Sequence, residues 1–166
     1  MNRFWNILMQ PIIEKVNAKY IVEIGSDTGI NTRNILDYCV EHDAYMTAID
    51  PVPKFDIDQF KAEYGDRFEI YKELSLNRLP LLEDYDVILI DGDHNWYTVY
   101  NELKIIEKKF KYEKFPLIFL HDVGWPYGRR DLYYSPETIP EKYRQPYKKL
   151  GMYPDQTELK EEGGLN

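Results

Sequence analysis

The stretch YIVEIGSDTG, residues 20–29, joins a run of strand-forming residues to a loop that contains two glycines. The first five residues are rich in β-branched and aromatic side chains, which favour a short strand. Gly25 and Gly29 allow the tight turn that a strand-to-helix connection needs, and a close approach of a ligand to the backbone. This stretch therefore predicts a strand, a ligand-binding turn and a helix in direct succession.

The expected helix runs to about His42. Asn31 or Thr32 is its predicted N-cap, because these side chains accept hydrogen bonds from free backbone N–H groups. At the other end, His42 lies where a positive charge interacts favourably with the helix dipole. The apolar positions expected to face the core are Ile35, Leu36, Cys39 and Val40. Cys39 is therefore interpreted as a packing residue and not as a nucleophile.

Strand and helix patterns alternate along the chain up to about residue 120. Further strands are expected at residues 44–49, 67–72, 85–90 and 116–120, and further helices at residues 56–64 and 95–110. The last of these helices has an apolar stripe made of Trp96, Val99, Leu103, Ile106 and Phe110. Because strands separated by helices pair in parallel through crossovers, the sequence predicts an α/β fold. We expect a doubly wound, mostly parallel, Rossmann-like sheet with helices on both faces.

The two ends of the chain have different patterns. Residues 2–17 predict a helix with a kink at Pro11. Its apolar side is expected to consist of Phe4, Ile7, Leu8, Ile12 and Val16. From residue 123 onward the periodic pattern ends, and prolines and tyrosines accumulate. We therefore expect residues 1–122 to form a cofactor-binding domain and residues 123–166 to form an extension or lid of that domain.

Composition narrows the class of protein. The 166 residues suit one domain, and the net charge of −8 without a basic stripe argues against a nucleic-acid partner. No apolar run is long enough to span a membrane, and the first residues lack the apolar segment of a secretory signal. A single cysteine excludes an internal disulfide framework. We expect a cytoplasmic protein that acts on a small molecule or glycan, and the sequence leaves open whether it forms a homo-oligomer.

Ionisable residues follow most of the expected strands. In chain order, these strand ends hold Asp50, then residues 73–75, then Asp91, Asp93 and His94, then His121 and Asp122. Ligands of open α/β sheets bind beyond the carboxyl ends of the strands, so these side chains are expected to line one site. Asp50 is placed to accept hydrogen bonds from both hydroxyls of a ribose. The chain contains neither the G-x-G-x-x-G dinucleotide motif nor a phosphate-binding P-loop motif.

Three motifs together, VEIGSDTG, AIDP and DVILIDGDH, resemble those of class I S-adenosylmethionine-dependent methyltransferases. The resemblance covers about residues 18–123 and implies S-adenosylmethionine as the cofactor. The residues that it implies in cofactor binding are Glu23, Gly25, Ser26 and Gly29 in the loop, Asp50 at the ribose, and Leu74 and Ser75 near the adenine. The family sheet usually has two further strands, which are not recognisable after FLHDV. The sheet is therefore expected to lack them, either as a shortened form or as a fragment of a longer protein.

The segments IDGDH and FLHDV are similar to a narrower subgroup, which includes macrocin- and mycinamicin-type sugar O-methyltransferases and cephalosporin-hydroxylase-like proteins. This resemblance implies a divalent metal, Mg²⁺ or another ion, held by Asp91, His121 and Asp122. The subgroup usually has two acids where this chain has His121 and Asp122, although imidazole also binds many divalent ions. His94 matches the position of the general base. The implied reaction is metal-assisted methyl transfer to a sugar or glycoside hydroxyl.

These assignments have alternatives that the sequence leaves open. Asp93 is interpreted as a cap of the helix that begins near Asn95, and His94 is either the base or a packed histidine. The acids are either metal ligands or structural groups in a methyltransferase that needs no metal. A nicotinamide dehydrogenase is disfavoured, because the first loop lacks that family's second close glycine.

The aromatic tail also has two interpretations. As a lid, it would stack Trp125 and Tyr127 on a sugar ring, while Arg129 and Arg130 bind a phosphate or carboxylate. These four residues are the predicted substrate contacts. Alternatively, the tail packs against the sheet or a neighbouring subunit. In that case the chain is a catalytically idle module that binds a partner through its tail.

Overall fold

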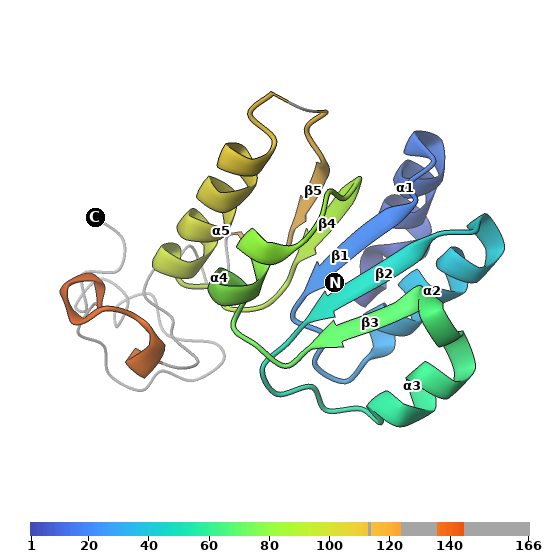
Figure 1. The fold of residues 1–166 in the computed structure, drawn as a ribbon, viewed down its shortest axis with the longest axis horizontal. Coiled ribbons are helices and arrows are strands. Elements are labelled where there is room, and N and C mark those ends of the chain that lie inside the picture. Colours follow the sequence, from blue (N-terminus) through green and yellow to red (C-terminus); the bar gives the residue numbers. More distant parts are fainter. Residues whose placement is uncertain (113, 124–135, 145–166) are drawn as a thin grey trace.

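The computed structural model describes residues 1–112, 114–123 and 136–144. Within them, parallel strands form one sheet in the order β3-β2-β1-β4-β5, as Figure 1 shows. The strands are β1 (Tyr20–Ile24), β2 (Tyr45–Ile49), β3 (Phe68–Tyr71), β4 (Val87–Ile90) and β5 (Leu117–Leu120). The strand order reverses between β1 and β4, which creates the switch point where doubly wound sheets bind ligands. The predicted fold class is confirmed.

Helices cover both faces of this sheet. One face packs against η2 (Trp5–Met9, a π-helix), α1 (Gln10–Val16), α2 (Ile30–His42) and α3 (Ile57–Tyr64). The other face packs against α4 (Ser75–Arg78), η4 (Leu79–Leu81) and α5 (Trp96–Lys109). The remaining short helices are η1 (Asn2–Phe4), η3 (Gly65–Arg67), η5 (Pro136–Thr138) and η6 (Glu141–Tyr143). The predicted helices and strands are therefore present, with small shifts at their ends.

The interior strand β4, between β1 and β5, shows why the core has two halves. Its sequence, VILI, is buried along its whole length, because helices cover both of its faces. Successive side chains point to opposite faces of a strand. Val87 and Leu89 therefore join the cluster under α2, whereas Ile88 and Ile90 join the cluster under α5. This fully buried strand ends at Asp91, which fixes that residue firmly at the edge of the sheet.

The first helical segment buries a different side from the predicted one. Its core residues are Trp5, Met9 and Ile13. The predicted positions Ile7, Leu8 and Val16 are exposed instead. Both sets recur every fourth residue, so spacing alone could not separate them. The indole ring gives the observed set more apolar surface to bury. Pro11 lies in the first turn of α1, where its missing N–H is harmless, so it does not interrupt a helix.

Two other residues expected in the core are largely exposed. Val40 on α2 is 54% exposed and Trp96 on α5 is 47% exposed. Val40 lies at the margin of the buried stripe of α2, which Ile35, Leu36 and Cys39 form as predicted. Trp96 is the first residue of α5, and at this end of the helix the apolar stripe does not contact the sheet.

Both predicted helix caps were wrong in detail. Gly29 is the N-cap of α2, with φ +78 and no side-chain cap, because Asn31 and Thr32 bind Glu23 instead. At α5 the N-cap is Asn95, whose Oδ1 accepts a hydrogen bond from the Thr98 N–H at 2.9 Å. Asp93 supports this cap from outside the helix, since it accepts hydrogen bonds from the Asn95 N–H and the Thr98 hydroxyl.

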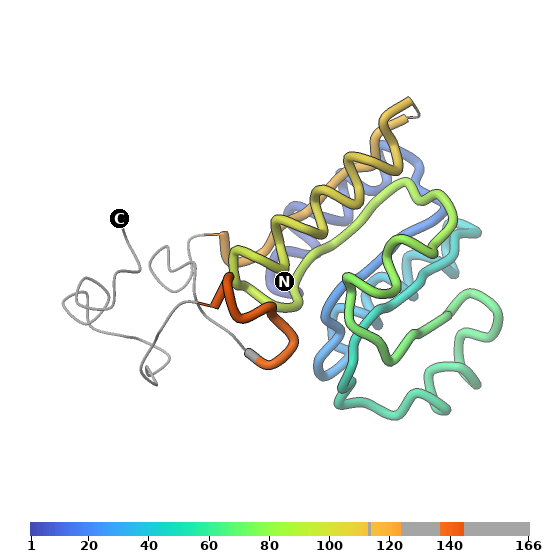
Figure 2. Tube along the Cα trace, turned by 60° about the vertical axis from the view of Figure 1, so that its left-hand side comes forward, coloured from blue at the N-terminus to red at the C-terminus, as the bar shows by residue number. Residues whose placement is uncertain are grey.

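After residue 123 the structure describes only residues 136–144. This segment lies beside the start of α5 in Figure 2, where the rings of Tyr97 and Tyr143 stack with centroids 5.0 Å apart. Trp125, Tyr127, Arg129 and Arg130 lie outside the described residues, as does any strand beyond β5. None of the helices in the described ranges is both long and apolar enough to cross a membrane.

Candidate functional site

The loop after β1 turns at Gly25, whose φ is +85. The Gly25 N–H donates to the Ile49 carbonyl at 2.9 Å, which ties the loop to the end of β2. A Cβ at this position would lie 2.4 Å from the Asp91 carbonyl oxygen. The loop therefore presses directly against the loop after β4, and only glycine leaves room for that contact.

Asp50 holds the same loop from the side of β2. Its Oδ2 accepts hydrogen bonds from the Ser26 and Asp27 N–H groups at 2.8 and 2.9 Å, and its Oδ1 accepts one from the Val52 N–H at 2.8 Å. The side chain is largely buried, so these bonds take the place of most of the water that would otherwise surround the carboxylate. The carboxylate that was predicted to bind a ribose thus has backbone amides of the glycine loop as its present partners.

Glu23 is a second buried carboxyl group behind the loop. Its oxygens accept hydrogen bonds from Asn31 Nδ2 at 2.7 Å and Thr32 Oγ1 at 2.6 Å. Burial raises the pKa of Glu23 to about 7, against the opposing effect of these hydrogen bonds. The Ser26 hydroxyl lies beside the same carboxyl group, and one nearby buried atom, Asn31 Oδ1, has no hydrogen-bond partner among the described residues. Such an orphaned polar atom fits a polar ligand in this loop.

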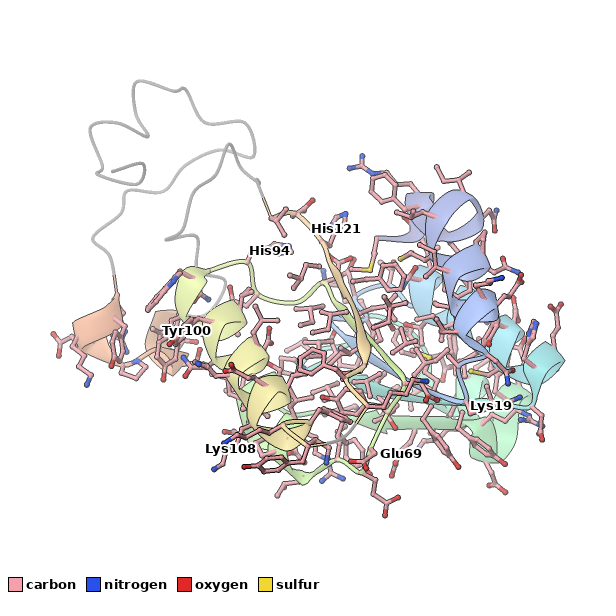
Figure 3. The ribbon with its side chains drawn as sticks, turned by 90° about the horizontal axis from the view of Figure 1, so that it is seen from above. Lys19, Glu69, His94, Tyr100, Lys108 and His121 are labelled. Atoms are coloured by element: carbon pink, nitrogen blue, oxygen red, sulfur yellow. The ribbon has the colours of Figure 1, made fainter. Side chains whose placement is uncertain are left out.

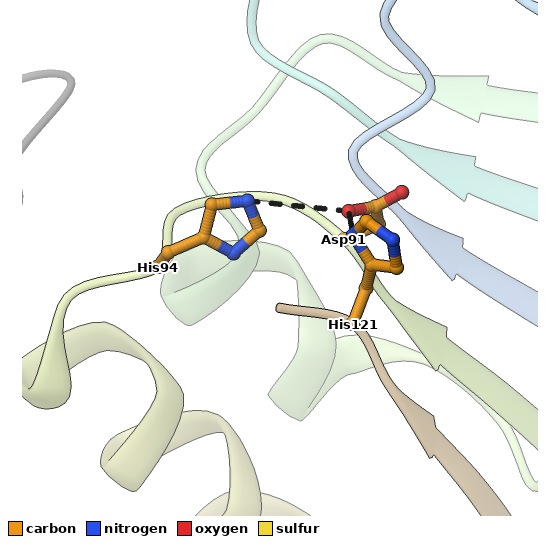
Figure 4. Close-up of side chains that lie close together, drawn as sticks. All are labelled: Asp91, His94 and His121. Carbon is orange, nitrogen blue, oxygen red and sulfur yellow. Dashed lines mark ion pairs between the residues drawn. The ribbon is translucent and has the colours of Figure 1, made fainter. Parts of the chain in front are cut away.

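A cluster of one carboxylate and two imidazoles lies next to the loop (Figure 4). Ligand-capable atoms of Asp91, His94 and His121 all lie within 4.8 Å of one another. Asp91 follows β4, where its N–H donates to the Ile24 carbonyl at 2.8 Å, and His121 follows β5. His121 Nδ1 is 2.7 Å from Asp91 Oδ1. On the other side of the carboxylate, the α-amino group of Met1 donates to Oδ2 at 2.8 Å.

Asp122 completes the group from the position next to His121. Its Oδ1 is 3.2 Å from His121 Nδ1, and its Oδ2 is 3.8 Å from His94 Nε2. Neighbouring residues on an extended strand point to opposite faces. Asp122 adopts a left-handed conformation, with φ +53, which lets both side chains of the pair face the cluster.

The two imidazoles differ in their surroundings. Burial lowers the pKa of His94, although the carboxylates of Asp122 and Asp91 act in the opposite direction. This favours the neutral ring, which can accept a proton or bind a metal. Both ring nitrogens of His121 are buried without a hydrogen bond in the described part of the chain, because the short contact to Asp91 lacks hydrogen-bond geometry. A lone pair of His121 is therefore available to a metal ion.

One member of this region was missed in the sequence. Glu102 on α5 is fully buried, and its Oε1 accepts a hydrogen bond from the Ser75 hydroxyl at the start of α4. Burial raises the pKa of Glu102 to about 8. Its position, four residues after Thr98 and four before Ile106, places it on the buried side of the helix. An acid within an apolar stripe was the signal that could have revealed it.

The structure brings together most of the predicted site residues. The glycine loop, Asp50, Asp91, His94, His121 and Asp122 lie around the carboxyl ends of β1, β2, β4 and β5. Leu74 and Ser75 follow β3 as the N-cap and first residue of α4, with Leu74 37% exposed and Ser75 buried. The four predicted substrate contacts, residues 125, 127, 129 and 130, are outside the described ranges.

Two solved structures share this fold. The SAH-bound Podospora anserina methyltransferase PaMTH1 is 19% identical with a TM-score of 0.55, and the match covers 68% of this chain and 50% of that one. A putative caffeoyl-CoA O-methyltransferase from Staphylococcus aureus is 21% identical with a TM-score of 0.51, covering 70% and 56%. The chain thus spans about half the length of these proteins. At such identities the likeness concerns the fold alone.

Sequence comparison gives a more specific result. No curated protein matches the chain. Residues 22–123, however, match the family model described as a methyltransferase domain, and this segment contains the glycine loop and the Asp–His–His cluster. Since the match extends over more than half of the sequence, the chain belongs to this family of methyltransferase domains.

Proposed function

We propose that this protein transfers a methyl group from S-adenosylmethionine to a hydroxyl of a sugar or glycoside, with the help of a divalent metal. The observation that carries the proposal is the contact between the glycine loop and the cluster. Gly25 lies against the backbone of Asp91, and the side chain of Asp91 is the shared member of the Asp–His–His group. A donor in the loop and an acceptor at the cluster would therefore be neighbours.

The residues of the loop suit a nucleoside with polar groups. Glu23, Gly25, Ser26 and Gly29 would line the donor, and the unpartnered Asn31 Oδ1 could accept a hydrogen bond from it. A carboxylate has about four acceptor sites. Asp50 accepts hydrogen bonds from three backbone N–H groups, and Oδ1 accepts only one of them. Oδ1 can therefore accept a further hydrogen bond from a ribose hydroxyl. Leu74 and Ser75, after β3, are the proposed adenine contacts. The bound donor would supply an activated sulfonium methyl group.

The cluster also fits a divalent ion. Asp91, His121 and Asp122 are the proposed ligands, and His94 lies close enough to serve as a base or a further ligand. The His121 imidazole suits ions such as Fe²⁺ or Zn²⁺, and the two carboxylates suit Mn²⁺ or Mg²⁺. Such an ion supplies Lewis-acid stabilisation of the charge that develops on the attacking oxygen.

Side chains of the protein can accept the proton that the attacking hydroxyl loses. A sugar hydroxyl is a poor nucleophile because its pKa lies far above 7, so a base must accept its proton during attack. Burial keeps His94 neutral and ready for this role. The Asp122 carboxylate, 3.8 Å from His94 Nε2, would then stabilise the protonated ring.

Two measurements test the proposal separately. Calorimetry with S-adenosylmethionine should show micromolar binding that is lost in Asp50→Ala. Mn²⁺ binding, followed by electron paramagnetic resonance, should be lost in Asp91→Asn and kept in His42→Gln, whose ring stacks on Tyr38 away from the site.

Methyl transfer to a panel of glycosides should then require the metal and fall in His94→Gln. If the protein binds the donor but transfers the methyl group without a metal, the result would favour a methyltransferase that uses His94 alone. If the protein does not bind the donor, the result would favour the catalytically idle module that binds a partner.

A further inference from the structure

A large groove lies at the opposite edge of the sheet from the candidate site. Its volume is about 1050 Å³, and it runs past the amino-terminal ends of β1 and β2, the segment before β4 and the segment before β5. In Figure 3, Lys19 and Glu69 mark this side of the molecule, far from His94 and His121. The groove is thus separate from the glycine loop and the Asp–His–His cluster.

The helices on this face leave the starts of β1 and β2 partly open. α4 is a single turn, and Leu81 of η4 and Phe110 after α5 form part of the groove wall. Tyr20 and Tyr45, at the starts of β1 and β2, are consequently 55% and 41% exposed. Their rings stack on each other with centroids 5.8 Å apart. The two tyrosine rings thus form an aromatic wall, and the Arg67 guanidinium lies 5.5 Å from the centroid of the Tyr45 ring, so one cation–π contact already exists there.

Carboxylates dominate the charged lining of the groove. The acids are Asp66, Glu69, Glu83, Asp84 and Asp86, against two cations, Arg78 and Lys114. Asp84 has Lys109 at 3.4 Å, and Asp86 accepts backbone N–H groups, whereas Asp66 and Glu83 have no ion pair within the described ranges. The groove therefore presents a net negative charge to an occupant.

The walls already show how a cation is held. The Arg78 guanidinium lies 3.2 Å from the centroid of the Tyr71 ring, in a cation–π contact. Two buried polar atoms of lining residues, Arg78 Nε and the Tyr85 hydroxyl, lack hydrogen-bond partners among the described residues. Tyr85 itself is only 5% exposed. A donor and a hydroxyl of this kind suit the carbonyl and N–H groups of a peptide backbone.

From this combination we propose that the groove binds an extended segment of a partner protein that carries lysine or arginine side chains. The cationic groups would pair with Asp66, Glu69 and Glu83 and stack on Tyr20 and Tyr45. The volume exceeds what a single ion requires, and it suits several residues of extended chain. A second copy of this chain is disfavoured as the occupant, because each copy has a net charge of −8.

Fluorescence anisotropy with a labelled peptide that alternates lysine and serine tests this proposal. The full chain should bind it with micromolar affinity at low ionic strength, and salt should weaken the binding. In the double variant Asp66→Lys/Glu69→Lys, affinity should fall by about 30-fold, because two attractions become repulsions. Tyr20→Ser/Tyr45→Ser should cost about 5-fold through the lost cation–π contacts.

A matched control separates docking from general attraction. Glu41→Lys/Asp58→Lys changes the net charge equally at exposed acids on α2 and α3, outside the groove. It should lower the affinity by no more than about 3-fold, as expected for a long-range effect. Circular dichroism verifies that each variant is folded. Equal losses in both double variants, equal binding of a glutamate–serine peptide, or no binding at low ionic strength would each overturn the proposal.

Discussion

The two edges of the sheet carry acids in opposite ways. At the carboxyl edge, Asp50 and Glu23 are buried, and each accepts specific hydrogen bonds from the protein. At the amino edge, Asp66, Glu69 and Glu83 line the groove as exposed side chains. Burial without partners is costly, so the first set must be held in place, whereas water stabilises the second. Acids that look alike in sequence can thus serve either short-range chemistry or long-range attraction.

The largest effect should come from the glycine that joins the two loops of the carboxyl edge. Gly25→Ala places a Cβ against the Asp91 carbonyl and strains a φ of +85, so we expect a loss of more than about 3 kcal/mol in unfolding free energy. Gly65→Ala is the control, since its φ of +59 is strained but nothing lies near the new Cβ, and it should cost about 1 kcal/mol. Urea denaturation compares them, and equal losses would contradict the packing of the two loops.

A smaller loss is expected when Asp50 changes to Asn. One oxygen becomes an NH₂ group that faces a backbone N–H, which should lower stability by about 2 kcal/mol. Asp66→Asn, in the exposed set, should leave the thermal unfolding midpoint unchanged. If both variants unfold at the wild-type temperature, the distinction between the two edges is wrong for stability.

A pH-dependent effect is expected from the buried Glu102. Its pKa of about 8 lies above the ordinary value of 4.5, so the folded state keeps a proton that the unfolded state loses. Wild-type stability should therefore fall as the pH rises from about 4.5 to 8, and level off above that. Glu102→Gln removes this contribution. The unfolding free energy of the variant minus that of the wild type should therefore be higher at pH 9 than at pH 5, by on the order of 2 kcal/mol.

Glu107→Gln on the same helix controls for the loss of a charge. Glu107 is exposed and pairs with Lys104, which lowers its pKa, so this variant should follow the wild-type pH dependence between pH 6 and 9. Denaturant titrations at several pH values decide the matter. A Glu102→Gln curve parallel to the wild-type curve would show that Glu102 is already charged in the folded protein.

The smallest effect belongs to the aromatic wall of the groove. Tyr45→Ser removes a ring that is 41% exposed and that stacks on Tyr20, and we expect it to lower the unfolding free energy by about 1 kcal/mol. Thermal unfolding measures this directly. A loss close to that of Asp50→Asn would mean that the ring supports the fold rather than standing ready for a partner.

The architecture was predictable because its signals are local. The apolar run that contains VILI was interpreted as a strand covered on both faces, and the alternation of strands with helices led to the parallel sheet. The strand ends then brought Asp50, Asp91 and His121 to one edge without knowledge of any contact.

Details that depend on partners distant in the sequence were not predictable. The Asn31 and Thr32 side chains were expected to cap α2, but Glu23 across the loop accepts their hydrogen bonds. Asp50 likewise finds the amides of Ser26 and Asp27 only once β1 and β2 are paired. The side that the first helix buries was misassigned because two sets of residues had the same spacing. Packing against the sheet determines that the set with Trp5 is the buried one.

The left-handed backbone at Asp122 has a practical consequence for anyone who changes this pair. Apart from glycine, asparagine and aspartate tolerate this conformation best, so alanine at position 122 would disturb the turn as well as delete the charge. Asparagine keeps the turn and removes only the charge. Loss of function in Asp122→Ala alone would thus be ambiguous, and a histidine–aspartate pair transplanted to another strand end would need the same bend before its side chains could act together.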